Sequence, residues 1–236
     1  GGTTAGKTGL MRCVERQTRE LLREEELRDG RFAGVKRWYE KGQLRREYSV
    51  NDKGNRDGRS REWNAQGVLL REGFEANSAT IGLHREWFET GKPKSIAHWG
   101  EPGGERRSDA ASRIDFNRDG QLTGLRCGRE PRLDDETRLC GHQGKPQLTE
   151  LFTERGLLAS RVTYERGQLL LLESYWDDGK LRFSEEIGSE RRVARQFARD
   201  GVLRKQTERR NGQRVQEQEY SERGTLVAEK RWSASA

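Results

Sequence analysis

The feature that most constrains this chain is a series of glycines that recurs about every twelve residues, each directly after a polar residue. Neighbouring members are 11 to 13 residues apart, or 22 to 29 where one is missing. Glycine at this interval interrupts any helix longer than about three turns. A polar residue followed by glycine between β-forming segments is typical of a tight hairpin, because glycine adopts positive φ without a Cβ clash. The series therefore predicts short strands joined by hairpins. Its members are Gly30, Gly42, Gly54, Gly67, Gly91, Gly120, Gly144, Gly156, Gly167, Gly179, Gly201, Gly212 and Gly224.

The residues around these glycines also repeat. An aromatic residue stands four positions before the glycine in segments 38–44, 63–69, 87–93 and 175–181, with weaker copies at 116–122, 197–203 and 220–226. The strongest hairpin pairs are Asp119-Gly120, Asp178-Gly179, Asp200-Gly201 and Asn211-Gly212. We expect helix only in two places, residues 14–28 and the C-terminal tail, where the glycines do not interrupt.

The composition favours a thin core. Leu, Val, Ile and Phe account for 43 of 236 residues, or 18%, whereas 36% are charged. So few large apolar side chains cannot fill one large core, but six Trp and a net charge of only +7 argue against disorder. We therefore expect each hairpin to contact only its neighbours, with the repeat-spaced tryptophans in the core and long Arg side chains pairing with Glu across strands. The tryptophans are Trp38, Trp63, Trp87 and Trp176.

The spacing of further glycines resembles the MORN repeat, in the divergent variant common in bacterial proteins. Gly34 and Gly58 each lie four residues after a member of the series, and Gly82 precedes Trp87 in the same way. The predicted fold is all-β, an elongated single-layer antiparallel β-meander or solenoid of MORN-like hairpin repeats. We expect an N-terminal segment 1–28, an array 29–100, an irregular segment 101–147, a second array 148–228 and a tail 229–236.

The resemblance also implies a function. Bacterial proteins made largely of this variant are often antitoxins or immunity proteins that neutralise a toxin, including effectors of type VI secretion, so the implied partner is a cognate toxin, for which a lipase or phospholipase is one possibility. The alternative is a scaffold or membrane-surface module, since MORN repeats have been linked to lipid contact and the +7 charge permits weak attraction to anionic lipid. The two signs of charge are interleaved along the chain, which argues against nucleic acid as a partner.

Three cysteines occur, at Cys13, Cys127 and Cys140. Cys127 and Cys140 flank residues 130–136, which contain turn-forming residues, so the two can face each other across a hairpin. A disulfide there would place the protein in an oxidising compartment such as the periplasm, and two buried free thiols are the alternative. The chain starts without Met, as a removed leader or a cloning remnant would leave it, so a cytoplasmic location stays open.

The sequence gives no reason to expect an enzyme. None of the three histidines, His84, His98 and His142, lies in a hydrolase or zinc motif, and adjacent acidic residues such as Asp134 and Asp135 point to opposite faces of a strand. We expect no catalytic residue, metal or cofactor.

The irregular segments 101–112 and 129–136 are the better candidates for partner recognition, because insertions in repeat arrays often form the contact face. Their charged candidates are Arg106, Arg107, Asp134, Asp135 and Glu136.

Overall fold

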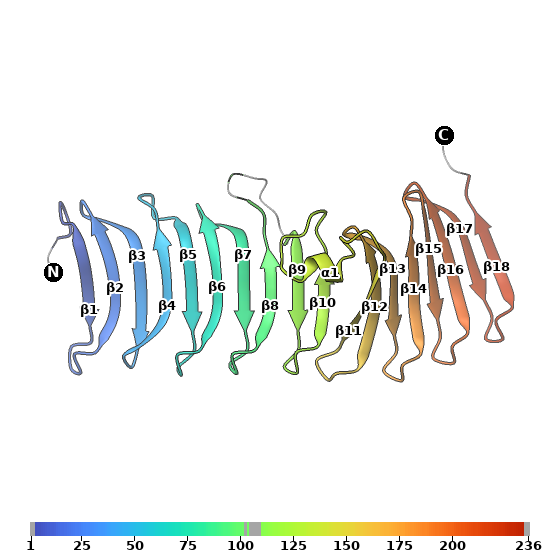
Figure 1. Ribbon diagram of the computed structural model, residues 1–236, viewed down its shortest axis with the longest axis horizontal. Helices are drawn as coiled ribbons and strands as arrows, with labels where there is room; N and C mark the ends of the chain where they lie inside the picture. Colours follow the sequence, from blue (N-terminus) through green and yellow to red (C-terminus); the bar gives the residue numbers. More distant parts are fainter. Residues whose placement is uncertain (1–2, 102, 104–109, 234–236) are drawn as a thin grey trace. The chain divides into compact units, whose positions relative to one another are not determined.

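The computed structural model describes residues 3–101, 103 and 110–233. These residues form eighteen strands and one four-residue helix (Figure 1). The strands belong to two antiparallel sheets, and within each sheet they pair in the order in which they occur in the chain. The predicted all-β antiparallel meander is confirmed. By its contacts the chain divides into two compact units, residues 1–120 and 121–236.

The elements of the first unit are β1 (Gly9–Val14), β2 (Leu21–Arg28), β3 (Arg31–Glu40), β4 (Gln43–Val50), β5 (Arg56–Trp63), β6 (Leu69–Ala76), β7 (Ala79–Trp87), β8 (Pro93–His98) and β9 (Ser112–Phe116). Those of the second are β10 (Leu122–Arg126), α1 (Glu136–Leu139), β11 (Gln147–Phe152), β12 (Leu158–Glu165), β13 (Gln168–Tyr175), β14 (Leu181–Ile187), β15 (Arg191–Phe197), β16 (Leu203–Arg210), β17 (Gln213–Tyr220) and β18 (Leu226–Arg231). No helix in the described part of the chain is long and apolar enough to cross a membrane.

Every glycine of the twelve-residue series has positive φ, between 75° and 87°. The turns that they form are of two kinds. Lys41 and Gly42 both have positive φ and make a two-residue turn of type I′, as do Asn211 and Gly212. Around Gly67 the turn has three residues, because the N–H of Asn64 bonds the carbonyl of Val68 and the N–H of Gly67 bonds that of Asn64. Members of the series thus lie where the chain reverses, except Gly144, which lies in the loop between α1 and β11.

The internal glycines of the MORN-like pattern lie in β-bulges. Glu25 of β2 lies opposite Lys36 of β3, and Leu27 lies opposite Phe32. The one residue of β2 between them therefore faces three residues of β3, which are centred on Gly34. Gly34 has φ +99° there, a backbone angle that residues with a Cβ rarely adopt. Equivalent bulges contain Gly58 in β5 and Gly82 in β7.

The helix expected at 14–28 is wrong, because this segment ends β1 and forms β2. Arg19 has φ +64°, which no helix contains, and Glu24 of β2 lies opposite both Arg12 of β1 and Arg37 of β3. Cross-strand pairing therefore overrides a local preference for helix. The tail was also expected to be helical, but β18 extends to Arg231.

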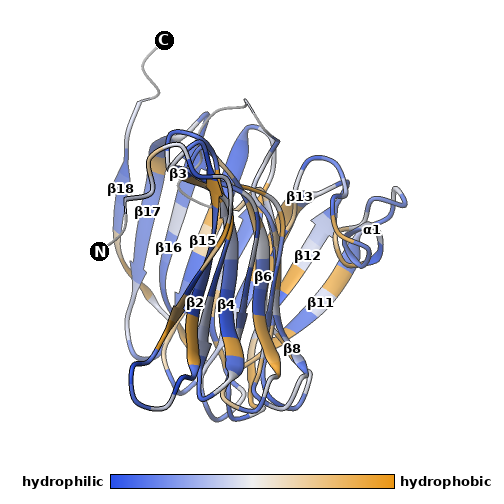
Figure 2. Cartoon of the chain, turned by 90° about the vertical axis from the view of Figure 1, so that its left-hand side faces the viewer, coloured by the Kyte–Doolittle hydropathy of each residue, from blue (hydrophilic) through white to orange (hydrophobic). Residues whose placement is uncertain are grey.

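Buried apolar side chains are spread through both units. Ala33, Ala97 and Ile114 are buried in the first unit, and Val162 and Val193 in the second. Hydrophilic and apolar residues occur within single strands such as β6 and β11 (Figure 2). The tryptophans predicted for the core are half-buried instead, because an open sheet has no second layer to cover large rings.

Candidate binding surface

Arg-Glu dipeptides set the charge pattern of the first unit. Neighbours along a strand point to opposite faces of the sheet. Arg46 of β4 lies opposite Glu62 of β5, and Glu47 lies opposite Arg61. The same reciprocal pairing repeats from β5 to β6 and from β6 to β7. Each face therefore carries a row of alternating charges that crosses the strands.

On one face the row contains one residue from each of the seven strands β1 to β7. We call it the Glu47 row. Glu24 is 7% exposed and accepts hydrogen bonds from Nε of Arg12 and from the hydroxyl of Tyr39, both at 2.8 Å. These two bonds, that of Arg12 foremost, hold the pKa of Glu24 below its ordinary value. The charges of the row from β1 to β5 are satisfied by one another, whereas Glu72 pairs with Arg59. Its members are Arg12, Glu24, Arg37, Glu47, Arg61, Glu72 and Arg85.

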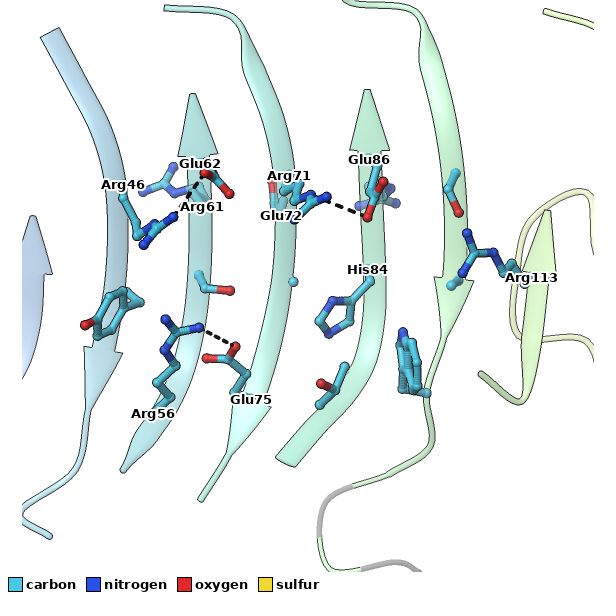
Figure 3. A pocket seen from close by; sticks show the side chains of 18 residues that line it. Arg46, Arg56, Arg61, Glu62, Arg71, Glu72, Glu75, His84, Glu86 and Arg113 are labelled. Atoms are coloured by element: carbon cyan, nitrogen blue, oxygen red, sulfur yellow. Dashed lines mark hydrogen bonds and ion pairs between the residues drawn. The ribbon is translucent and has the colours of Figure 1, made fainter. Parts of the chain in front are cut away.

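The opposite face carries the pocket row, Arg46, Glu62, Arg71 and Glu86 (Figure 3). Its ion pairs measure 3.2 Å for Arg46–Glu62 and 3.5 Å for Arg71–Glu86, against 2.7 Å for Arg37–Glu47, and the Arg71 side chain is 62% exposed. Such exposed pairs contribute only about 0.2–1 kcal/mol each. The side chains of this row are therefore available to a partner at little cost to the fold.

Beside the row lies a shallow pocket of about 390 Å³, lined by residues of β4 to β9 and by Trp99. At one end the Arg56 guanidinium lies 4.5 Å from the centre of the Tyr48 ring and 3.3 Å from Oε1 of Glu75. Oε2 of Glu75 is buried and has no hydrogen-bond partner among the described residues. This end combines a stacked cation, a half-buried aromatic ring and an unsatisfied acceptor.

The His84 ring lies within the pocket, where the bulge at Gly82 redirects it. The three residues 82–84 oppose Gly73 alone, and a Cβ at Gly73 would collide with the His84 ring. Nε2 of His84 lies 3.0 Å from the carbonyl oxygen of Phe74, and the ring meets Trp99 edge-on at 6.3 Å. The bulge and the missing side chain of Gly73 together leave space for this imidazole. Figure 3 shows the His84 ring among the residues that line the pocket.

In the second unit Glu208 of β16 is the most strongly perturbed carboxylate. It is 7% exposed and accepts hydrogen bonds from Arg191 and Arg210, each at 2.9 Å. These bonds lower the pKa of Glu208 to about 2.

The cysteines of the irregular segment are joined. Cys127, just after β10, and Cys140, just after α1, form a disulfide with a Cα–Cα distance of 5.7 Å. Cys13 is free and half-buried.

Of the residues predicted for recognition, Asp134 and Asp135 are exposed, and Asp135 precedes α1 and pairs with Arg138 at 3.1 Å. The prediction that Glu136 contacts a partner is wrong. Its side chain is fully buried, and its carboxylate accepts hydrogen bonds from the N–H groups of Gly128, Arg132 and Leu133 at 2.6, 2.7 and 3.1 Å. It organises the loop and has no surface to offer. Arg106 and Arg107 lie outside the described residues.

Glu136 is also close to two groups that can bind metal. Its carboxylate, Sγ of Cys140 and a ring nitrogen of His142 lie within 4.8 Å of one another. While Cys140 is in the disulfide, its sulfur is not a thiolate and is not an effective ligand.

The pocket residues were not predicted as a site from the sequence. The signal that could have found them is the Arg-Glu dipeptide itself, at 46–47, 61–62, 71–72 and 85–86, one in each of four successive strands.

No protein-family model and no curated protein matches this chain. A similar solved structure is the crystal structure of TcdB2-TccC3-Cdc42, with 12% identity, 94% of this chain covered and a TM-score of 0.22. The chain spans about 15% of the length of that structure's matched chain. A likeness this weak bears on neither fold nor function.

Proposed function

We propose that this chain is a binding protein that neutralises a toxin by direct contact, and that the pocket face of the first unit is its contact surface. The observation that carries the proposal is the composition of that face. Tyr48, Trp99 and several arginines line one open, shallow depression. Trp, Tyr and Arg are the residue types that most often dominate protein interfaces.

The geometry of the face supports a protein partner over a small molecule. The depression is shallow and open, whereas small-molecule sites enclose most of their ligand. The exposed pairs of the pocket row present both signs of charge in a fixed order, which suits a partner surface with the complementary order. The toxin as partner, and the neutralising role, come from the MORN resemblance.

The disulfide supports an oxidising compartment, since such bonds persist there and are rare in the cytosol. A periplasmic location is therefore part of the proposal.

The test is co-expression with the product of the adjacent gene, followed by co-purification. We expect the chain to suppress toxicity and to form a complex with that product. Trp99→Ala and Arg71→Glu should each weaken the complex at least tenfold, whereas Arg223→Glu, an exposed arginine in the β17–β18 turn, should not.

Two results would count against the proposal. One is an adjacent product that is harmless or unaffected by the chain. The other is equal loss of binding in the Arg223→Glu control. Binding to anionic vesicles that survives physiological salt would favour the membrane-surface alternative.

A further inference from the structure

The loop between β10 and β11 contains four potential metal ligands, two of which are joined in the disulfide. Cys127 and Cys140 supply sulfur, Glu136 a carboxylate and His142 an imidazole. We propose that reduction of this disulfide converts the loop into a site for a divalent transition metal ion such as Zn²⁺, held by these four side chains.

The distances are close to those that a metal requires. With Zn–S of about 2.3 Å and Zn–N and Zn–O of about 2.0–2.2 Å, the ligands of a tetrahedral zinc stand roughly 3.5 to 3.8 Å apart. Three of the donor atoms already lie within 4.8 Å of one another, and the Cys127 sulfur is bonded to the Cys140 sulfur. Movements of about 1 Å, with rotation of the half-exposed Cys127 side chain, would complete the set.

The imidazole of His142 has an unused buried nitrogen. Its Nε2 is inaccessible to solvent and has no hydrogen-bond partner among the described residues. Buried polar atoms are nearly always satisfied, and this unpaired nitrogen belongs to the ring that lies beside the Cys140 sulfur and the Glu136 carboxylate, which points to a missing ligand. The ring lies directly against Gly167, where an added Cβ would come within 2.9 Å of Cε1 of His142, so the missing side chain leaves room for the imidazole.

Glu136 is preorganised in the same way. Oε2 accepts two of its backbone hydrogen bonds, from Arg132 and Leu133, whereas Oε1 accepts one, from Gly128. Oε1 therefore keeps a lone pair for a metal. The three N–H donors also act as the outer shell that orients a metal-binding carboxylate.

The surrounding backbone supports the site independently of the disulfide. The N–H of Gly167 bonds the carbonyl of Cys140 at 2.9 Å, and the N–H of Arg166 bonds that of Gly141 at 3.0 Å. The hydroxyl of Thr149 on β11 donates to the carbonyl of Leu139. These bonds hold Cys140 and His142 against the sheet when the sulfur–sulfur bond opens.

The conversion is chemically balanced. Two molecules of a small thiol reduce the disulfide, and two electrons pass to the protein as the reductant becomes its own disulfide. The resulting thiols of Cys127 and Cys140 lose their protons to solvent when the metal binds. The two states exclude each other, so the loop would be closed by sulfur in an oxidising compartment and by metal in a reducing one.

The experiment uses the full chain carrying Cys13→Ser, so that the only thiols are the two of the loop. The protein is reduced with a phosphine, freed of reductant without oxygen, and titrated with Co²⁺ as a spectroscopic substitute for Zn²⁺. We expect one equivalent to give thiolate-to-cobalt charge-transfer bands and tetrahedral ligand-field bands, and Zn²⁺ to abolish them. The oxidised protein should give neither.

His142→Ala should weaken cobalt binding at least tenfold, and His98→Ala, a histidine of the first unit, should leave it unchanged. The proposal is overturned if the reduced chain shows no charge-transfer bands at stoichiometric cobalt, or if His142→Ala binds as tightly as its parent.

Hydrogen exchange covers the case in which reduction loosens the loop. Zn²⁺ must then restore amide protection at residues 128–142, and failure to do so also counts against the site. None of these measurements depends on a toxin partner, so they stand or fall separately from the proposed function.

Discussion

Arg37 of β3 donates a hydrogen bond from Nε to Oε2 of Glu47 on the neighbouring strand β4, at 2.7 Å. The other carboxylate oxygen of Glu47 is bonded by Arg61 of β5. One carboxylate thus connects three strands. Burial by itself would raise the pKa of Glu47, but the bonds from Arg61 and Arg37 outweigh it and leave the pKa below its ordinary value. Along the Glu47 row, ion pairing takes part of the role that an apolar core has in a layered protein.

Glu47→Gln should therefore destabilise the protein. The amide keeps the shape of the side chain but loses the charge that both arginines share, and its NH₂ group cannot accept a bond from either. We expect the free energy of unfolding to fall by about 1–2 kcal/mol, measured by urea denaturation at neutral pH.

Glu62→Gln is the matched control, because Glu62 follows Arg61 directly and points to the other face. Its partner is the exposed Arg46, at 3.2 Å, so the loss should stay below about 0.5 kcal/mol. Equal losses of unfolding free energy in the two variants would contradict the proposal that the Glu47 row stabilises the fold whereas the pocket row is available to a partner.

The stability of the second unit should depend on pH through Glu208. Its pKa is about 2 in the folded chain, against an ordinary value of 4.5, so the folded state binds fewer protons than the unfolded state between those values. The stabilisation from Glu208 is fully present above pH of about 4.5 and is lost as pH falls toward 2. Glu208→Gln should cost roughly 1–2 kcal/mol at pH 7, and this difference should shrink steadily in urea titrations between pH 5 and pH 2.5.

Glu222→Gln provides the comparison, since Glu222 is an exposed residue of the β17–β18 turn. It should match the parent protein across the same pH range. If the difference in unfolding free energy between the parent and Glu208→Gln does not change with pH, the destabilisation comes from packing and not from the charge.

The sequence predicted the fold well because its strongest signal is local. A glycine after a polar residue specifies a reversal within three or four residues, and every member of the series adopts the required positive φ. The internal glycines were recognised as part of a repeat, but their role in bulges depends on the pairing register, since Gly34 is identified as a bulge only by what opposes it in β2.

The errors and omissions all concern contacts that form only in the folded chain. Residues 14–28 are rich in Glu, Arg and Leu, which favour helix locally, and only pairing with β1 and β3, which places Glu24 opposite Arg12 and Arg37, makes this segment a strand. The position of His84 over Gly73 was not foreseeable, because it requires the bulge at Gly82 to be in register with a glycine on β6. Glu136 carries a charge, which suggested a surface role, but its burial depends on three N–H groups that converge only in the folded loop.

Gly73→Ala tests the placement of His84. The φ of Gly73 lies outside the positive region, so alanine is compatible with the backbone, and any cost comes from the collision with the imidazole. We expect a loss of about 1–3 kcal/mol. The double variant Gly73→Ala/His84→Ala should recover at least half of it in urea denaturation, and no recovery would show that the ring does not occupy that space.

The turn at Lys41-Gly42 offers a stabilising change. Lys41 has φ +49° in a type I′ turn, a conformation that costs most residues energy but that Asn adopts readily. The Lys41 side chain is exposed, so Lys41→Asn should raise the free energy of unfolding by about 0.5 kcal/mol. The reverse change in the equivalent turn of the second unit, Asn211→Lys, should lower it by a similar amount, because Asn211 has φ +48°. Opposite shifts in the midpoints of urea unfolding would show that the backbone conformation of the turn decides the effect. Shifts of the same sign would mean that contacts of the side chains outweigh it.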